Sequence, residues 1–111
     1  ANFTGHAQTA PVAVSSSGGT LAANMTESNV FTSTLTENVA TLTLTGPAQG
    51  QTVNMLFTQD ATGSRTMAWP AAFKWPGGTA ETLSTNSNAV DLLVITYLGT
   101  SWYASMLKDL S

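Results

Sequence analysis

Few residues in this sequence are of a type that carries out acid–base or metal chemistry. The 111 residues include one histidine, His6, and no cysteine, so a thiolate or multi-histidine metal site cannot be assembled. A hydrolytic triad of His6 with a serine and an aspartate would need a nucleophile on a sharp turn, and no such motif is present. Asp60, Asp91 and Asp109 could offer oxygen ligands to calcium, but their spacing matches no calcium-loop signature. We therefore expect no enzyme, no metal and no cofactor.

Aromatic side chains are the better candidates for a binding surface. A sugar ring packs on an aromatic face, and asparagine or glutamine beside it can bond the hydroxyl groups. The candidates for a glycan contact, or for a contact between subunits, are Trp75, Tyr97, Trp102 and Tyr103. The competing interpretation is that these rings fill the core, and we favour it because aromatic residues dominate core packing.

Composition excludes further classes of protein. Lys and Arg total 3 and Asp and Glu total 6, giving a net charge of −3, and so few cations cannot neutralise a nucleic-acid backbone. No apolar run reaches the ~18 residues of a membrane span. Charged residues make up 8% of the chain, against about 25% in ordinary domains, whereas 30 residues are Thr or Ser. A surface with so few charges is poorly protected against association, so we expect much of it to be buried against partners.

The hydrophobic period is two residues through most of the chain, which predicts β-strands. Thr alternates with apolar residues most regularly over residues 31–36 and 40–45, and Gly, Pro and Asp residues mark turns between segments. The expected strands cover residues 12–15, 20–25, 31–36, 40–45, 52–58, 64–69, 89–98 and 101–107. Such short, closely spaced strands without a helical stripe predict an all-β fold, either an antiparallel β-sandwich or a jelly-roll-like barrel.

Three local features refine this prediction. The Ser-Ser-Gly18-Gly19 segment is expected to join the first two strands as a hairpin, and Gly99-Thr100 to join the last two. The segment 89–98 is apolar on both sides, so it is either the central strand or meets another subunit with its second face. Residues 1–10 show no period and are expected to form an extended N-terminal arm, followed by one β-sandwich domain over residues 11–111.

A motif in the middle of the chain resembles a β-domain of tailed-bacteriophage virion proteins. The pattern TQDxTGxRT leads into WPxxxKWPGGT, then into a Thr/Asn-rich loop, a Val-Asp strand and a Gly-x-x-Trp-Tyr hairpin, and the resemblance covers roughly residues 12–107. The residues of this motif to which we assign a structural role are Asp60, Gly63, Arg65, Trp69, Pro70, Lys74, Trp75, Pro76 and Gly77.

Elementary physical chemistry suggests how this motif keeps its shape. A residue before proline avoids the helical region, so Trp69-Pro70 and Trp75-Pro76 should form two extended corners of a tight excursion. A bidentate pair between Arg65 and Asp60 would fix the preceding turn. The carboxylates expected to partner Arg65 and Lys74 are Asp60, Glu81 and Asp91.

The resemblance implies a component of a phage particle and leaves two functions open. The first is a capsid (head) decoration protein, a virion structural protein that docks on the lattice of the major capsid protein and stabilises it. The alternative is the receptor-binding tip of a tail fibre, which contacts other tail-fibre components and host-surface glycan. A tip needs an upstream shaft, for which 111 residues leave no room, and the small first residue Ala1 suits a complete product. These two points favour decoration.

The resemblance also implies partners and a location. Decoration spikes and fibre tips are commonly three-fold, so we expect a homotrimer in the virion, made in the cytoplasm of a bacterial host. If the protein decorates capsids, its N-terminal arm should supply the docking contact because it has no core period. The docking residues expected there are Asn2, Phe3 and His6.

Overall fold

The computed structural model describes residues 10–110, and in this range the predicted all-β fold is confirmed. The one helical element of this range is a short 3-10 turn, η1 (Pro76–Gly78). The strands are β1 (Val12–Ala13), β2 (Thr20–Asn24), β3 (Val30–Leu35), β4 (Thr41–Thr45), β5 (Thr52–Gln59), β6 (Phe73–Lys74), β7 (Val90–Leu98) and β8 (Ser101–Leu107). The predicted arm over residues 1–10, with Asn2, Phe3 and His6, lies outside the described residues except for Ala10.

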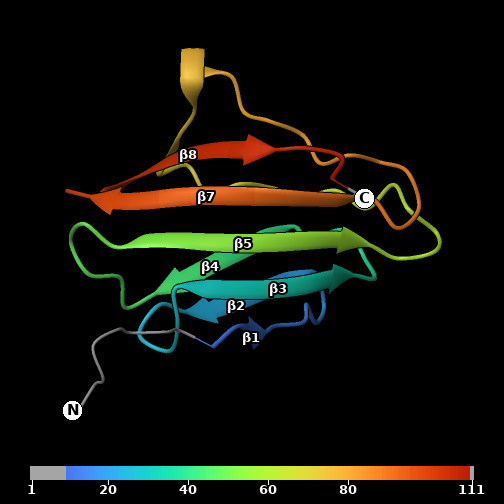
Figure 1. Cartoon of the computed structure of the whole chain (residues 1–111), viewed down its shortest axis with the longest axis horizontal. Helices are drawn as coiled ribbons and strands as arrows, with labels where there is room; N and C mark the ends of the chain where they lie inside the picture. The colour runs from blue at the N-terminus through green and yellow to red at the C-terminus, as the bar shows by residue number, and fades with distance from the viewer. Residues whose placement is uncertain (1–9, 111) are drawn as a thin grey trace.

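The strands form two sheets (Figure 1). The larger sheet has the order β1-β3-β5-β7-β8-β6, and the smaller one consists of β2 and β4. The chain alternates between the two sheets from β1 to β5, so that each strand pairs in parallel with the next strand but one. The chain from β1 to β5 therefore coils back and forth between the two layers. β5, β7 and β8 instead form an antiparallel meander.

The expectation of antiparallel sheets is wrong for four of the six strand pairs, which are parallel. The predicted hairpin at Gly18-Gly19 is reduced to a single antiparallel bridge between Ser17 and Thr20, because β1 and β2 belong to different sheets. Alternating hydrophobicity determines which side chains of a strand face the core, but it carries no information on the neighbouring strand. The two-residue turn Gly99-Thr100 joins β7 and β8 as expected.

One predicted strand is absent and another was missed. Residues 64–69 form no strand, and their contribution to a ladder is a single bridge between Val39 and Met67. The segment instead lies over the inner face of the larger sheet, where Trp69 packs edge-on against Phe57 at 6.0 Å between ring centroids. β6 is two residues long, too short for a periodic signal.

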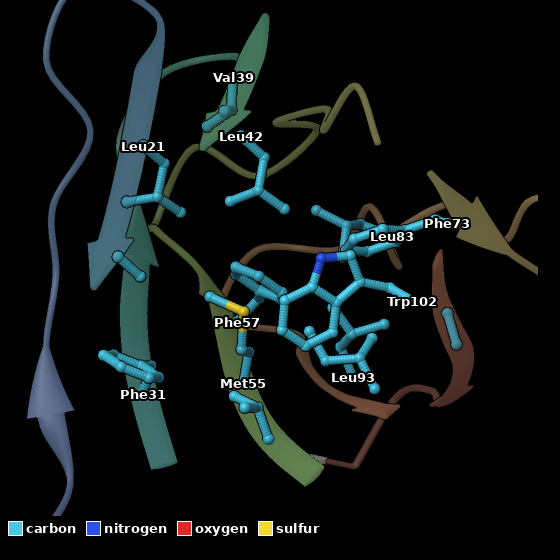
Figure 2. Close-up of a cluster of buried hydrophobic side chains, with 14 of the residues drawn as sticks. Leu21, Phe31, Val39, Leu42, Met55, Phe57, Phe73, Leu83, Leu93 and Trp102 are labelled. Atoms are coloured by element: carbon cyan, nitrogen blue, oxygen red, sulfur yellow. The ribbon is translucent and has the colours of Figure 1, made fainter. Parts of the chain in front are cut away.

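The core lies between the two sheets and under the segment that connects β5 to β7. Leu21 and Leu42 from the smaller sheet project toward Phe57 and Met55 of β5 (Figure 2). Phe73, Leu83 and Trp102 extend the same apolar cluster beyond the edge of the smaller sheet. Two short strands thus cover one part of the inner face, and a long connection covers the rest.

β7 is the central strand that the sequence suggested, since it lies between β5 and β8. Leu93 and Ile95 on its inner side are fully buried. Leu92 on its outer side pairs with Leu56 and Leu107 and is only partly buried. The outer face of the larger sheet therefore carries apolar side chains that no element of the described chain covers.

Candidate functional site

A proline ends β6 and opens the edge of the larger sheet. β6 pairs with Trp102 and Tyr103 of β8, but Pro76 has no N–H with which to continue the ladder. The chain instead turns away from the sheet, with the Gly78 N–H bonded to the Trp75 carbonyl at 2.9 Å. Gly77 in this turn has a φ of 67°, the left-handed conformation that glycine adopts without steric cost. The second half of β8 is left without a strand on this side, and η1 projects beyond it (Figure 1).

The opened edge forms a shallow cleft of about 470 Å³. Its lining residues come from the end of β6, the following turn and the middle of β8: Lys74, Trp75, Pro76, Tyr103, Ala104 and Ser105. Lys74 and Tyr103 are register partners in adjacent strands, so their side chains lie on the same face of the sheet. Tyr103 is 52% exposed. The cleft thus combines two aromatic rings with a lysine and a hydroxyl.

A group of packed aromatic residues holds Trp75 from behind. Its ring lies 5.3 Å from that of Trp69 and 6.0 Å from that of Phe73, measured between centroids. Trp69 is fixed in turn, because its indole N–H donates to the Glu81 carbonyl at 2.7 Å. Trp75 itself has φ −106° and ψ 152°, the extended conformation expected of a residue before proline. The cleft wall is therefore preorganised.

The turn that precedes this aromatic group is held by an ion pair. Two guanidinium nitrogens of Arg65 donate to Asp60, Nε to Oδ1 at 3.4 Å and a terminal nitrogen to Oδ2 at 2.9 Å. Asp60 Oδ1 also accepts the N–H of Gly63 at 3.0 Å. The hydrogen bond from Arg65 is the main reason that the pKa of Asp60 lies below its ordinary value, and the Gly63 N–H adds to it.

Gly63 brings this turn against the loop before β7. Its φ is 73°, and a Cβ atom at this position would lie 2.7 Å from the Thr85 carbonyl oxygen. The adjacent Ser64 N–H donates to the same carbonyl at 2.8 Å. The glycine of the TQDxTGxRT pattern is therefore required by a close approach of two main-chain segments.

Two buried polar side chains, whose roles the sequence did not reveal, hold neighbouring main-chain segments in place. Gln59 donates from Nε2 to the carbonyls of Arg65 and Ser84, both at 2.9 Å, and accepts the Arg65 N–H at 3.0 Å. Asp91 accepts from the N–H and hydroxyl of Ser84 at 2.6 and 2.8 Å and from the Asp109 N–H at 2.8 Å. A polar residue on the inner side of an apolar strand was the available signal, because such a residue needs partners.

The structure separates the four aromatic candidates. Trp75 and Tyr103 line the cleft. Trp102, in contrast, is 5% exposed, and its ring centroid lies 4.8 Å from that of Tyr97. Trp102 thus lies in the core, as the alternative interpretation held, and cannot contact a glycan in this fold. Neighbouring residues of a strand point to opposite faces, so the period of β8 already implied that only one of Trp102 and Tyr103 could face outward.

The charged residues of the described range also differ from expectation. Arg65 pairs with Asp60 as predicted, and Lys108 lies 3.9 Å from Glu81. Asp91 bonds to main-chain N–H groups and a serine hydroxyl and to no cation. Lys74 has no carboxylate within 4.0 Å among residues 10–110. Among the described residues, Lys74 is thus the one cation without a carboxylate partner, and its ammonium group can pair with a ligand.

No three histidine, cysteine or carboxylate residues within 10–110 are grouped closely enough to hold a metal ion. No helix in that range has the length and apolar character needed to cross a membrane.

Comparison with known proteins gives one match. A family model described as "Putative phage tail fibre C-terminal domain" matches residues 16–102, more than half of the chain. No curated protein and no solved structure matches this sequence. The matched range includes Lys74, Trp75 and Pro76 of the cleft and ends one residue before Tyr103.

Proposed function

We propose, from the premise that the chain belongs to the phage tail fibre C-terminal domain family, that it is the receptor-binding tip of a tail fibre and recognises glycan on the host surface. The observation that carries this proposal is the cleft between Trp75 and Tyr103 at the open edge of the sheet. Exposed rings on a rigid support suit sugar recognition, because the positive C–H groups of a sugar ring are attracted to the negative face of an aromatic ring.

The proposed mode of action is binding without a catalytic step. The Trp75 wall is held before the ligand arrives, so this side chain loses little freedom on binding. The surroundings of the cleft supply a hydroxyl at Ser105 and an ammonium at Lys74, groups that bond saccharides but make no acid–base pair. The protein would act in the virion after synthesis in the bacterial cytoplasm.

The capsid decoration hypothesis is the second candidate and has weaker support. Its docking contact was assigned to Asn2, Phe3 and His6, which lie outside the described residues. No feature of residues 10–110 favours a capsid lattice over a tail fibre, whereas the family match favours the fibre. We therefore place the fibre tip first.

We also propose that the tip is a homotrimer that buries the part of the outer face of the larger sheet around Leu92 and leaves Tyr103 accessible. Leu56, Leu92 and Leu107 lie side by side across β5, β7 and β8, and Leu107 is 58% exposed. All three positions are apolar and uncharged, so an isolated monomer would expose a continuous apolar patch to water. A second copy of the chain is the proposed occupant because the patch carries no charge that would repel an identical apolar surface, and contacts repeated around a three-fold axis close into a ring.

Competition for host cells tests the receptor-binding function. The purified protein is incubated with host bacteria before the phage is added, and adsorption is measured. We expect the protein to block adsorption and Tyr103→Ala to abolish the block. Leu110→Ala is the matched control, since both side chains are 52% exposed. If a labelled antibody against this protein binds phage heads and not tails, and the protein does not block adsorption, the protein is a capsid decoration protein instead.

A further inference from the structure

We propose that the cleft binds an anionic saccharide unit, whose carboxylate or phosphate group pairs with Lys74 while its ring packs against Tyr103 and Trp75. This inference rests on the proposed receptor-binding function and specifies its class of ligand. Three independent features of the cleft support it: its charge, its aromatic walls and its open main chain.

The charge of the cleft selects for an anion. The protein has a net charge of −3 and three cations in all, and two of these, Arg65 and Lys108, are paired with carboxylates. Lys74 is exposed and lines the cleft. A lysine ammonium is a compact point charge with three donors, so it can take a carboxylate or a phosphate oxygen without a fixed geometry.

The two aromatic walls select for a ring. Trp75 is half-buried and held by Trp69 and Phe73, whereas Tyr103 is exposed and free to present its face and its hydroxyl group. An aliphatic anion or a free phosphate ion would leave both rings unused. A saccharide fills this role because it combines C–H faces with a rim of hydroxyl groups.

The sheet edge adds main-chain hydrogen bonding. The Trp102 N–H points to the β6 side, where it donates to the Ala72 carbonyl at 2.9 Å. Main-chain groups of a strand alternate sides with a period of two, so the carbonyl of Ala104 faces this side too. Pro76 has no N–H to offer it. The Ala104 carbonyl thus lacks a donor at the Pro76 position, and the exposed Ser105 hydroxyl beside it is available to saccharide hydroxyl groups.

Binding to an array of bacterial oligosaccharides tests the inference. The array carries uronic-acid, sialic-acid and phosphate-bearing members, each beside a neutral derivative in which the carboxyl group has been reduced or the phosphate removed. We expect the wild-type protein to bind acidic members and to lose about fivefold or more in affinity for the neutral derivatives. The derivative that loses affinity shows whether the group is a carboxylate or a phosphate. Binding should also weaken as salt is added.

Two variants assign the effect to the cleft. Lys74→Met should remove the preference for acidic members, and Tyr103→Ala should weaken binding of acidic and neutral members alike. Lys108→Met is the matched control, since it removes another exposed lysine outside the cleft and should leave binding unchanged. Thermal unfolding confirms that each variant is folded.

The outcomes separate this inference from the proposed function. Equal binding of acidic and neutral members, or full acid preference in Lys74→Met, would overturn the anionic ligand and leave a receptor-binding tip. If the protein blocks adsorption but binds no saccharide on the array, the saccharide assignment is wrong. If it binds none and blocks nothing, both proposals fall.

Discussion

The side chain of Gln59 is hydrogen-bonded to both the N–H and the carbonyl of Arg65, at 3.0 and 2.9 Å. This amide closes the turn that Arg65 also closes from outside through its ion pair with Asp60. Gln59 is almost fully buried at the end of β5, so its polar groups must be satisfied within the protein. The start of the long segment that carries Trp69 and Trp75 is therefore fixed to the end of a core strand.

Replacing this amide should be costly. Gln59→Ala leaves the Arg65 N–H and two carbonyls without their partner, and we expect a loss of about 2–4 kcal/mol in the free energy of unfolding. Gln49→Ala is the control, because Gln49 makes a similar pair of bonds to Gly99 in an exposed position and should lose less than ~1 kcal/mol. Urea unfolding measures both variants, and equal losses would show that burial of Gln59 is unimportant.

Gly63 should tolerate no side chain. Gly63→Ala adds a methyl group 2.7 Å from the Thr85 oxygen and holds alanine at a φ of 73°, so we expect a loss of at least ~2 kcal/mol. Gly50→Ala separates the two causes, because Gly50 has a φ of 82° with nothing within 4 Å and should lose only ~1 kcal/mol. Thermal unfolding of the two variants makes the comparison, and equal losses would contradict the close-approach argument.

Acid should weaken the fold through Asp60 and Glu37. The Arg65 hydrogen bond holds the pKa of Asp60 below its ordinary value, and the hydrogen bond from the Gly19 N–H does the same to the pKa of Glu37. A carboxyl group with a lowered folded pKa stabilises the protein above its unfolded pKa, and this stability is lost as the pH falls through the folded value. We therefore expect stability to decline as the pH falls from about 4.5.

The variant Asp60→Asn tests this pH dependence. Asparagine keeps part of the hydrogen bonding without the charge, so urea unfolding between pH 2.5 and 6 should show a flatter acid decline than in the wild type. A slope equal to that of the wild type would mean that Asp60 contributes nothing to it. Both measurements should be made at low salt, because Asp60 is close to solvent and added salt screens the pair.

Charge on the outer face of the larger sheet should disrupt the proposed trimer. Leu92→Lys places an ammonium between Leu56 and Leu107, where burial against another subunit would be strongly unfavourable. We expect a trimer for the wild-type protein and a folded monomer for the variant by light scattering. Thr41→Lys, on an exposed position of β2's partner strand β4, is the control and should remain trimeric. A wild-type monomer at micromolar concentration would refute the assembly.

The sequence by itself determined the positions of most strands and the faces that they bury. Alternation predicted β3, β4, β5, β7 and β8 to within a residue or two at each end, because burial of one face imposes a two-residue period on the chain. It also predicted the turn at Gly99-Thr100 and the pair of Arg65 with Asp60, since both depend on residues close together in sequence. Such local interactions can be inferred without knowledge of the fold.

Only the tertiary structure decided which strands are neighbours and which aromatic rings reach solvent. The parallel pairing of β2 with β4 and of β3 with β5 joins segments about twenty residues apart, and no local pattern encodes such a choice because any apolar face could cover another. The cleft depends on the same long-range pairing. Lys74 meets Tyr103 only because β6 pairs with β8, and the edge beyond stays open because Pro76 cannot extend that ladder.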